Sequence, residues 1–127
     1  MNFKHLIILL IFFAGISSCK SVSVENETSR TEIKKMVTDT ETVLVDVRIP
    51  EEFSEKTAKG AINIPLATIE QNLDFLKKQK QIVVFCNRGR QAEQAVELLK
   101  KNGITNVYSA KTVQNVEAIK MKNKSER

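Results

Sequence analysis

Short apolar runs recur through the middle and end of this chain, separated by segments in which apolar positions have helical spacing. The runs are rich in β-branched residues and are bounded by turn residues, such as Pro50 after the first and Pro65 after the second, which is the pattern of β-strands. The pattern predicts strands at residues 43–47, 61–64, 82–85 and 106–109.

Apolar residues three or four positions apart predict helices between these strands. Ser29 and Glu32 fit a capping box at the start of the first helix, and Asn102 with Gly103 forms a suitable end for a later one. The predicted helices cover residues 29–37, 66–76, 91–101 and 113–121, with one further helical turn at 51–54.

Strands that alternate with helices predict an α/β domain around a central, mostly parallel sheet of four to five strands flanked by helices. The uniformly apolar run at 82–85 supports this, because both faces of a parallel strand are covered. Sites in such sheets lie at the carboxyl ends of the strands. Asp46 and Arg48 follow one predicted strand and Cys86 follows another, so we expect the functional site at this edge.

Residues 1–18 have the pattern of a lipoprotein signal peptide. Their apolar stretch, residues 6–16, is shorter than the ~20 residues that a membrane-spanning helix requires. Small residues lead to Cys19, as in the bacterial lipobox, where a peptidase cuts before the cysteine and its sulfur carries a lipid. The alternative is an ordinary secretory peptide with an incidental cysteine. We expect an exported chain, anchored by Cys19 to the bacterial cell envelope on the periplasmic side.

The remaining chain divides into a polar tether at residues 19–28, one domain at 29–121 and a basic tail at 122–127. The net charge of +5 is scattered up to that tail. Basic residues do not form a stripe with interleaved aromatic residues, so no nucleic-acid partner is expected.

Cys86 is the strongest candidate for chemistry, because it stands where a predicted strand ends and a helix begins. A thiol there faces the amides of a helix N-terminus, a setting that favours the reactive thiolate. Gly89 allows the backbone to curl around one point, while Arg88 and Arg90 add positive charge that attracts a small anion. The alternative is a buried, inert cysteine beside two solvated arginines. A Cys19–Cys86 disulfide would require an unlipidated Cys19.

Several other chemistries lack their residues. The only histidine, His5, lies in the predicted signal peptide, which argues against a Cys–His protease pair and a Cys/His metal site. The chain has no Cys-x-x-Cys pair, no phosphate-binding loop with lysine and no dinucleotide fingerprint. No metal and no cofactor are therefore expected, and Cys86 must be activated by backbone amides and arginines.

Three motifs, at residues 45–48, 60–65 and 85–92, occur in the order and at the spacing of a single-domain rhodanese. The chain resembles this family over residues 30–119, and most of all its small exported phage-shock-protein-E type. The resemblance implies a thiosulfate sulfurtransferase, in which Cys86 takes the outer sulfur of thiosulfate as a persulfide and passes it to a thiol or cyanide. It also implies that the loop residues Asn87, Arg88, Gly89, Arg90 and Gln91 bind the anionic donor.

The same resemblance assigns Asp46 and Arg48 to a pair that ties neighbouring loops together; a plain ion pair at a strand end is equally open. Related phosphatases have an arginine six positions after the cysteine, where this chain has Ala92, so the loop favours sulfur transfer. Residues 110–112 replace the family's usual Gly-Gly beside the pocket. A non-catalytic rhodanese-like binding module and a sulfur or redox sensor at the membrane remain the alternative functions.

Overall fold

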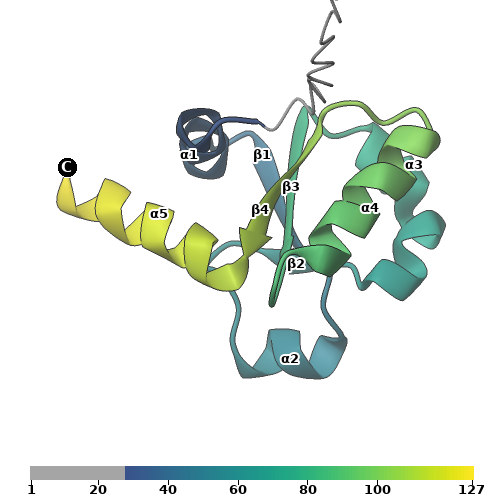
Figure 1. Cartoon of the computed structure of the whole chain (residues 1–127), viewed down its shortest axis with the longest axis horizontal. Coiled ribbons are helices and arrows are strands. Elements are labelled where there is room, and N and C mark those ends of the chain that lie inside the picture. Colours follow the sequence, from purple (N-terminus) through teal and green to yellow (C-terminus); the bar gives the residue numbers. More distant parts are fainter. Residues whose placement is uncertain (1–27) are drawn as a thin grey trace, which may run out of the picture.

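A computed structural model describes residues 28–127, which form one parallel four-stranded sheet with helices on both faces (Figure 1). The strand order is β2-β1-β3-β4, so β3 lies inside the sheet and β4 at its edge. In chain order the elements are α1 (Arg30–Thr38), β1 (Thr42–Asp46), α2 (Pro50–Glu55), β2 (Ile62–Asn63), η2 (Leu66–Asn72), α3 (Leu73–Lys77), β3 (Gln81–Cys86), α4 (Arg90–Lys101), β4 (Val107–Thr112) and α5 (Val113–Ser125).

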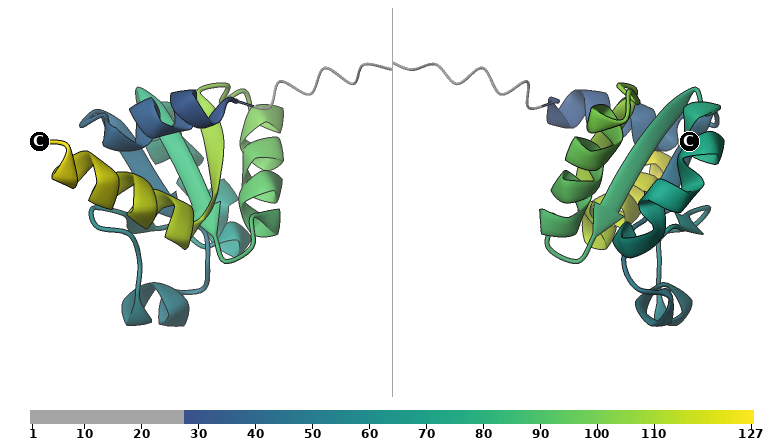
Figure 2. Two further views of the ribbon diagram at one scale, coloured as in Figure 1. Left: turned by 60° about the vertical axis from the view of Figure 1, so that its left-hand side comes forward. Right: turned by 90° about the vertical axis from the view of Figure 1, so that its right-hand side faces the viewer.

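The core consists of two apolar clusters, one on each face of the sheet. Alternate residues of a strand point to opposite faces, so in β3 the side chains of Ile82 and Val84 join one cluster and those of Val83 and Phe85 the other. The first cluster packs under α3 and α4, and the second under α1 and α5 (Figure 2). The prediction of a mostly parallel α/β sheet is confirmed, with four strands.

The predicted helix ends are confirmed where a local cap defines them. Ser29 and Glu32 form the capping box of α1. Gly103 has a φ of +84°, and the N–H of Ile104 returns to the carbonyl of Leu99, which closes the end of α4. The last helix is longer than predicted, because α5 continues to Ser125 through most of the segment expected to be a basic tail.

The helix predicted at 66–76 has a different form. Residues of η2 form a 3-10 helix and only those of α3 are α-helical. Leu66 and Ile69, three positions apart, face the core together, as the three residues per turn of a 3-10 helix allow. The Asn72 side chain also donates a hydrogen bond to the carbonyl of Thr68 at 2.9 Å, which supports the last turn of η2.

Residues 1–27 lie outside the described part of the chain. The signal peptide, the lipidation of Cys19 and most of the tether therefore stay predictions. Among residues 28–127, no helix has the length and apolar character needed to cross a membrane.

Candidate active site

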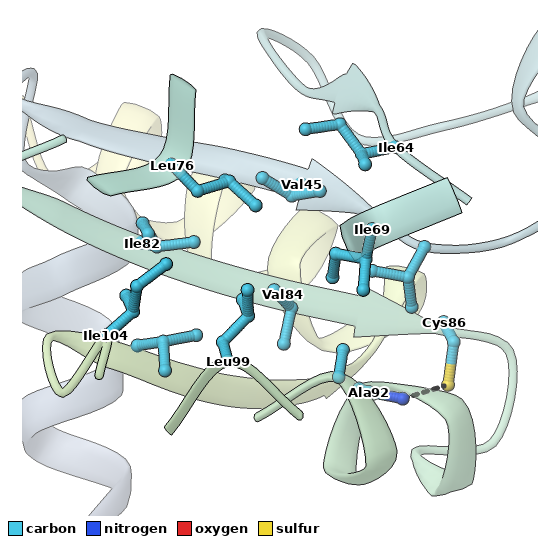
Figure 3. Packing of buried hydrophobic residues seen from close by; sticks show 13 residues of the cluster. Val45, Ile64, Ile69, Leu76, Ile82, Val84, Cys86, Ala92, Leu99 and Ile104 are labelled. Atoms are coloured by element: carbon cyan, nitrogen blue, oxygen red, sulfur yellow. Dashed lines mark hydrogen bonds between the residues drawn. The ribbon is translucent and has the colours of Figure 1, made fainter. Parts of the chain in front are cut away.

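Cys86 is the last residue of β3, and its side chain ends at the first turn of α4 (Figure 3). The sulfur accepts hydrogen bonds from the backbone N–H of Gly89 at 3.0 Å and from that of Ala92 at 3.4 Å. Cys86 is only 2% exposed, so water competes little for these donors. N–H groups aimed at one sulfur from a helix N-terminus stabilise negative charge there, as a nucleophilic sulfur requires.

Gly89 forms the turn that brings those amides to the sulfur. It is the N-cap of α4, with a left-handed φ of +94° that few residues with a side chain adopt. A Cβ at this position would also meet the Cβ of Lys111 at 3.3 Å. Both the backbone conformation and the limited space therefore call for glycine, as the sequence predicts.

Lys111 contacts the Cys86 sulfur from β4, whereas the amides of Gly89 and Ala92 contact it from the loop and α4. The pairing of β3 with β4 shifts register after Val84, so that Cys86 pairs with Thr112. At this irregularity Lys111 has a φ of +68°, and its carbonyl oxygen lies 3.6 Å from the Cys86 sulfur, close enough to accept the thiol proton. The segment that replaces the usual Gly-Gly is thus in direct contact with the candidate nucleophile.

Asp46 and Arg48 form a buried ion pair beneath the loop. Asp46 is fully buried and Arg48 is 7% exposed. The Arg48 guanidinium donates to the Asp46 carboxylate, with its Nη2 at 2.7 Å from Oδ2 and its Nε at 3.0 Å from Oδ1. Hydrogen bonding to Asp46 raises the pKa of Arg48, so the guanidinium stays charged although water hardly reaches it.

Arg48 connects this pair to the cysteine loop, because its Nη1 donates to the side-chain oxygen of Asn87 at 3.0 Å. The Asn87 nitrogen in turn donates to a carboxylate oxygen of Glu52, on α2, at 2.6 Å. The Thr57 hydroxyl donates to Asp46 at 2.8 Å and completes the network. Asp46 and Arg48 thus do more than pair with each other: they tie the end of β1 to the residue after Cys86.

The remaining predicted residues lie at the surface, close to Cys86 in sequence. Arg88, Arg90 and Gln91 have exposed side chains, on the loop and in the first turn of α4. Exposed guanidinium groups there add positive charge to the loop, which attracts anions. The structure thus brings together all the predicted residues of the loop with Asp46 and Arg48, while Cys19 lies outside the described residues.

Sequence reasoning placed residues 110–112 beside the pocket, but it missed Ala92 and Glu52 as direct neighbours of the loop. The Ala92 amide had a signal, because the N–H groups of a first helical turn have no partner within the helix. Glu52 had none, and the direct contact of the Lys111 carbonyl with the sulfur was not foreseen. Lys111 is 25 positions from Cys86, and Glu52 is 35 positions from Asn87, so their contacts depend on the folded chain.

A model of the rhodanese-like domain family matches residues 29–112, which include Asp46, Arg48 and the whole cysteine loop. The chain belongs to the rhodanese family. The predicted resemblance to this sulfurtransferase family, built on an α/β domain, is confirmed.

Individual relatives agree with this assignment. Thiosulfate sulfurtransferase PspE of Escherichia coli K12 is 36% identical over 80 residues, which cover 61% of this chain and 77% of the relative. The uncharacterized protein YqhL of Bacillus subtilis is 30% identical over 115 residues, covering 85% of this chain and 88% of the relative.

Solved structures show the same rhodanese fold. A structure described as rhodanese with anions from E. coli has a TM-score of 0.54 at 36% identity, over 58% of this chain and 89% of that one. The human single-domain sulfurtransferase TSTD1 has a TM-score of 0.53 at 27% identity, over 62% and 82% of the two chains.

Proposed function

We propose that this rhodanese is a thiosulfate sulfurtransferase that carries sulfur as a persulfide on Cys86. The hydrogen bonds from Gly89 and Ala92 to the Cys86 sulfur are the observation that carries the proposal. They supply the anion stabilisation that a thiolate nucleophile needs, without histidine, of which the described residues have none. The similarity to the E. coli protein named thiosulfate sulfurtransferase PspE supports thiosulfate as the donor.

In the first half-reaction the Cys86 thiolate attacks the outer sulfur of thiosulfate. A new S–S bond forms to Cys86, and the bond between the two sulfurs of thiosulfate breaks, so that sulfite leaves with its electron pair. The products are a cysteine persulfide anion and sulfite, and the total charge is unchanged. The amides that receive the thiolate are placed to stabilise the anion that replaces it.

In the second half-reaction a thiol or cyanide attacks the outer sulfur of the persulfide. The S–S bond to Cys86 breaks, and its electron pair returns to Cys86 as a thiolate. Cyanide becomes thiocyanate in this step, and a thiolate becomes a persulfide. The exposed Arg88 and Arg90 are proposed to attract the anionic donor, and Asn87, Gly89 and Gln91 to line the loop that holds it.

The first prediction concerns the persulfide. The purified, reduced chain incubated with thiosulfate should release sulfite and gain the mass of one sulfur atom at Cys86, as measured by peptide mass spectrometry. Cys86→Ser should lose both signals, because a hydroxyl at this position remains protonated and is a far weaker nucleophile. Its circular dichroism spectrum should match that of the parent chain.

Reduced Cys86 that gains no sulfur would overturn the proposed activity. If Cys86 takes up one sulfur but does not turn over in excess thiosulfate and cyanide, the chain would instead be a sulfur sensor.

Arg88→Ala and Arg90→Ala test the binding role, and each should raise the KM for thiosulfate about three- to ten-fold, as removal of one charge near an anion site does.

We also propose that Cys19 carries a lipid that anchors the chain to the cell envelope. The support is the sequence pattern of residues 1–18 followed by Cys19. Cells that produce the chain would be labelled with a radioactive fatty acid, with Cys19→Ala as the control. Label on the parent chain alone is expected, and no label on either would contradict the anchor.

A further inference from the structure

The side-chain amide of Asn87 is held at both ends by charged groups. Its oxygen accepts a hydrogen bond from Arg48 Nη1 at 3.0 Å, and its nitrogen donates one to Glu52 Oε1 at 2.6 Å. Turning the amide over would put its N–H group against the guanidinium and its oxygen against the carboxylate. Arg48 and Glu52 together therefore define a single orientation for the residue that follows Cys86.

Glu52 is well placed to act as one half of this clamp. It belongs to α2, a short helix that projects from the body of the domain in each view (Figures 1 and 2). Arg48 Nη2 donates to the carbonyl of Glu52 at 3.4 Å and to that of Lys56 at 2.5 Å. The buried arginine therefore holds α2 at Glu52 and at the residue that follows the helix, and the Glu52 carboxylate is turned toward the cysteine loop.

The same carboxylate places negative charge beside a loop that is proposed to bind anions. Arg48 lies within electrostatic range of both Glu52 and Cys86. Its pKa is raised first by the hydrogen bond to Asp46, and further by the charges of these two residues. The Glu52 carboxylate lies 2.6 Å from the side-chain nitrogen of Asn87, next to the nucleophile in sequence, and its charge repels an approaching dianion. Glu52 thus has two effects on the site, one through the orientation of Asn87 and one through its charge.

We propose that Glu52 is a positioning residue of the sulfur-transfer site, which holds the cysteine loop through Asn87 and weakens the capture of anionic donors. The kinetic part of this inference rests on the proposed function. The part that concerns the loop and its charge rests on Cys86 as a thiol, whatever reaction it performs.

The kinetic test uses Glu52→Gln in the full chain, with thiosulfate as donor and cyanide as acceptor. The kcat should fall about five-fold, because a charge-assisted hydrogen bond to Asn87 becomes a neutral one. The KM for thiosulfate should fall as well, by about two-fold, because a like charge is removed. If Glu52 served stability alone, the substitution would lower the melting temperature and leave both kcat and KM at the values of the parent chain.

A second readout needs no sulfur transfer. Alkylation of Cys86 by iodoacetate, an anion, and by iodoacetamide, which is neutral, is followed by peptide mass spectrometry. In Glu52→Gln the rate with iodoacetate relative to iodoacetamide should rise about three-fold, because the repulsion of anions is removed. The rate with iodoacetamide alone should fall, because the loop is held less firmly.

Glu51→Gln is the matched control, since Glu51 is an exposed carboxylate in the same turn of α2 and the substitution changes the net charge equally. It should match the parent chain in all readouts.

In an Asn87→Ala background, Glu52→Gln should no longer change kcat. Equal behaviour of the Glu51 and Glu52 variants, or an undiminished kcat effect without Asn87, would overturn the proposal. Altered alkylation in a chain that transfers no sulfur would refute the proposed function and leave the clamp standing.

Discussion

Two residues beside Cys86 have left-handed backbone conformations, Gly89 with a φ of +94° and Lys111 with a φ of +68°. Glycine adopts this region freely, whereas a residue with a Cβ is strained there by roughly 1–2 kcal/mol. The strained Lys111 places its carbonyl oxygen 3.6 Å from the Cys86 sulfur, close enough to accept the thiol proton. Conformational strain in this chain thus lies at the wall of the candidate active site.

The second prediction is that Lys111→Gly is more stable than Lys111→Ala. Both variants lose the lysine side chain, but only glycine removes the strain. Part of that gain is offset by the greater freedom of glycine in the unfolded chain, which leaves a difference of about 0.5–1 kcal/mol in the free energy of unfolding. Urea denaturation measures it. A less stable Lys111→Gly variant would contradict the strain at this position.

Buried charge is also confined to the neighbourhood of the cysteine loop. Asp46 and Arg48 are the buried charged residues of the described chain, and each has hydrogen-bond partners beyond the other, namely Thr57 for Asp46 and Asn87 for Arg48. Buried ions are tolerated when their remaining donors and acceptors are satisfied. The pair therefore serves as a rigid support from which the cysteine loop is held.

At the scale of elements, helix ends account for both stability and chemistry. The N-cap residue of α4, Gly89, has no side chain to cap the helix. Instead, the Cys86 sulfur accepts hydrogen bonds from the backbone N–H groups of Gly89 and Ala92. The N-terminus of α1 has the ordinary solution, a capping box, in which Ser29 Oγ accepts from the Glu32 N–H and Glu32 Oε2 accepts from the Ser29 N–H. The N-terminus of α1 is therefore capped by its own residues, which stabilises the helix, whereas the amides at the N-terminus of α4 are directed at the sulfur that is proposed to become an anion.

The third prediction concerns the pH dependence of that capping box. The hydrogen bond from the Ser29 backbone lowers the pKa of Glu32. A carboxyl group whose pKa is lower in the folded state contributes stability above its unfolded pKa, about 4.3, and loses that contribution as the pH falls through the lowered folded value. Glu32→Gln should therefore be less stable than the parent chain at pH 7, and the difference should vanish at acidic pH.

Urea denaturation of both chains between pH 3 and 7, about the range that spans the titration of a glutamate, would test this. Glu51→Gln serves as the control, because Glu51 is also an exposed carboxylate in a first helical turn. A Glu32→Gln difference that persists undiminished at the acidic end would show that the ionised carboxylate is not its source.

At the scale of the whole molecule, the sheet separates two cores, and α5 closes the second of them. Val113 and Val116 of α5 are buried, whereas Met121 is 71% exposed. Two contacts hold the middle of the helix to the segment between α2 and β2: Lys120 Nζ donates to the Lys59 carbonyl at 2.6 Å, and Glu117 pairs with Lys56 at 3.3 Å. Beyond these contacts α5 extends from the body of the domain (Figure 2).

The fourth prediction follows from this division of α5. Removal of residues 122–127 should change the free energy of unfolding by no more than about 0.5 kcal/mol, because these residues are mostly exposed. Val116→Ala should instead cost about 2 kcal/mol, because it leaves a cavity in the second core. Urea denaturation would compare the two chains, and a larger loss from the truncation would mean that the end of α5 makes stabilising contacts.

Local physics made much of this protein predictable from the sequence by itself. Apolar runs, the Ser29 capping box and the cap at Gly103 depend on residues within one element, and the sequence alone therefore determined the strands, most helices and the α/β class. It also determined that Cys86 lies at a strand-to-helix junction with Gly89 in the turn. Those features need no knowledge of distant segments, because neighbouring residues decide them.

Only the tertiary structure decided which distant groups surround the cysteine. Asn87 meets Arg48 across 39 positions and Glu52 across 35, and the Lys111 carbonyl meets Cys86 across 25. These contacts depend on the order of strands in the sheet and on the register shift between β3 and β4, which no local pattern encodes. Long-range hydrogen bonds form where packing brings loops together, and that packing depends on the whole core rather than on any one motif.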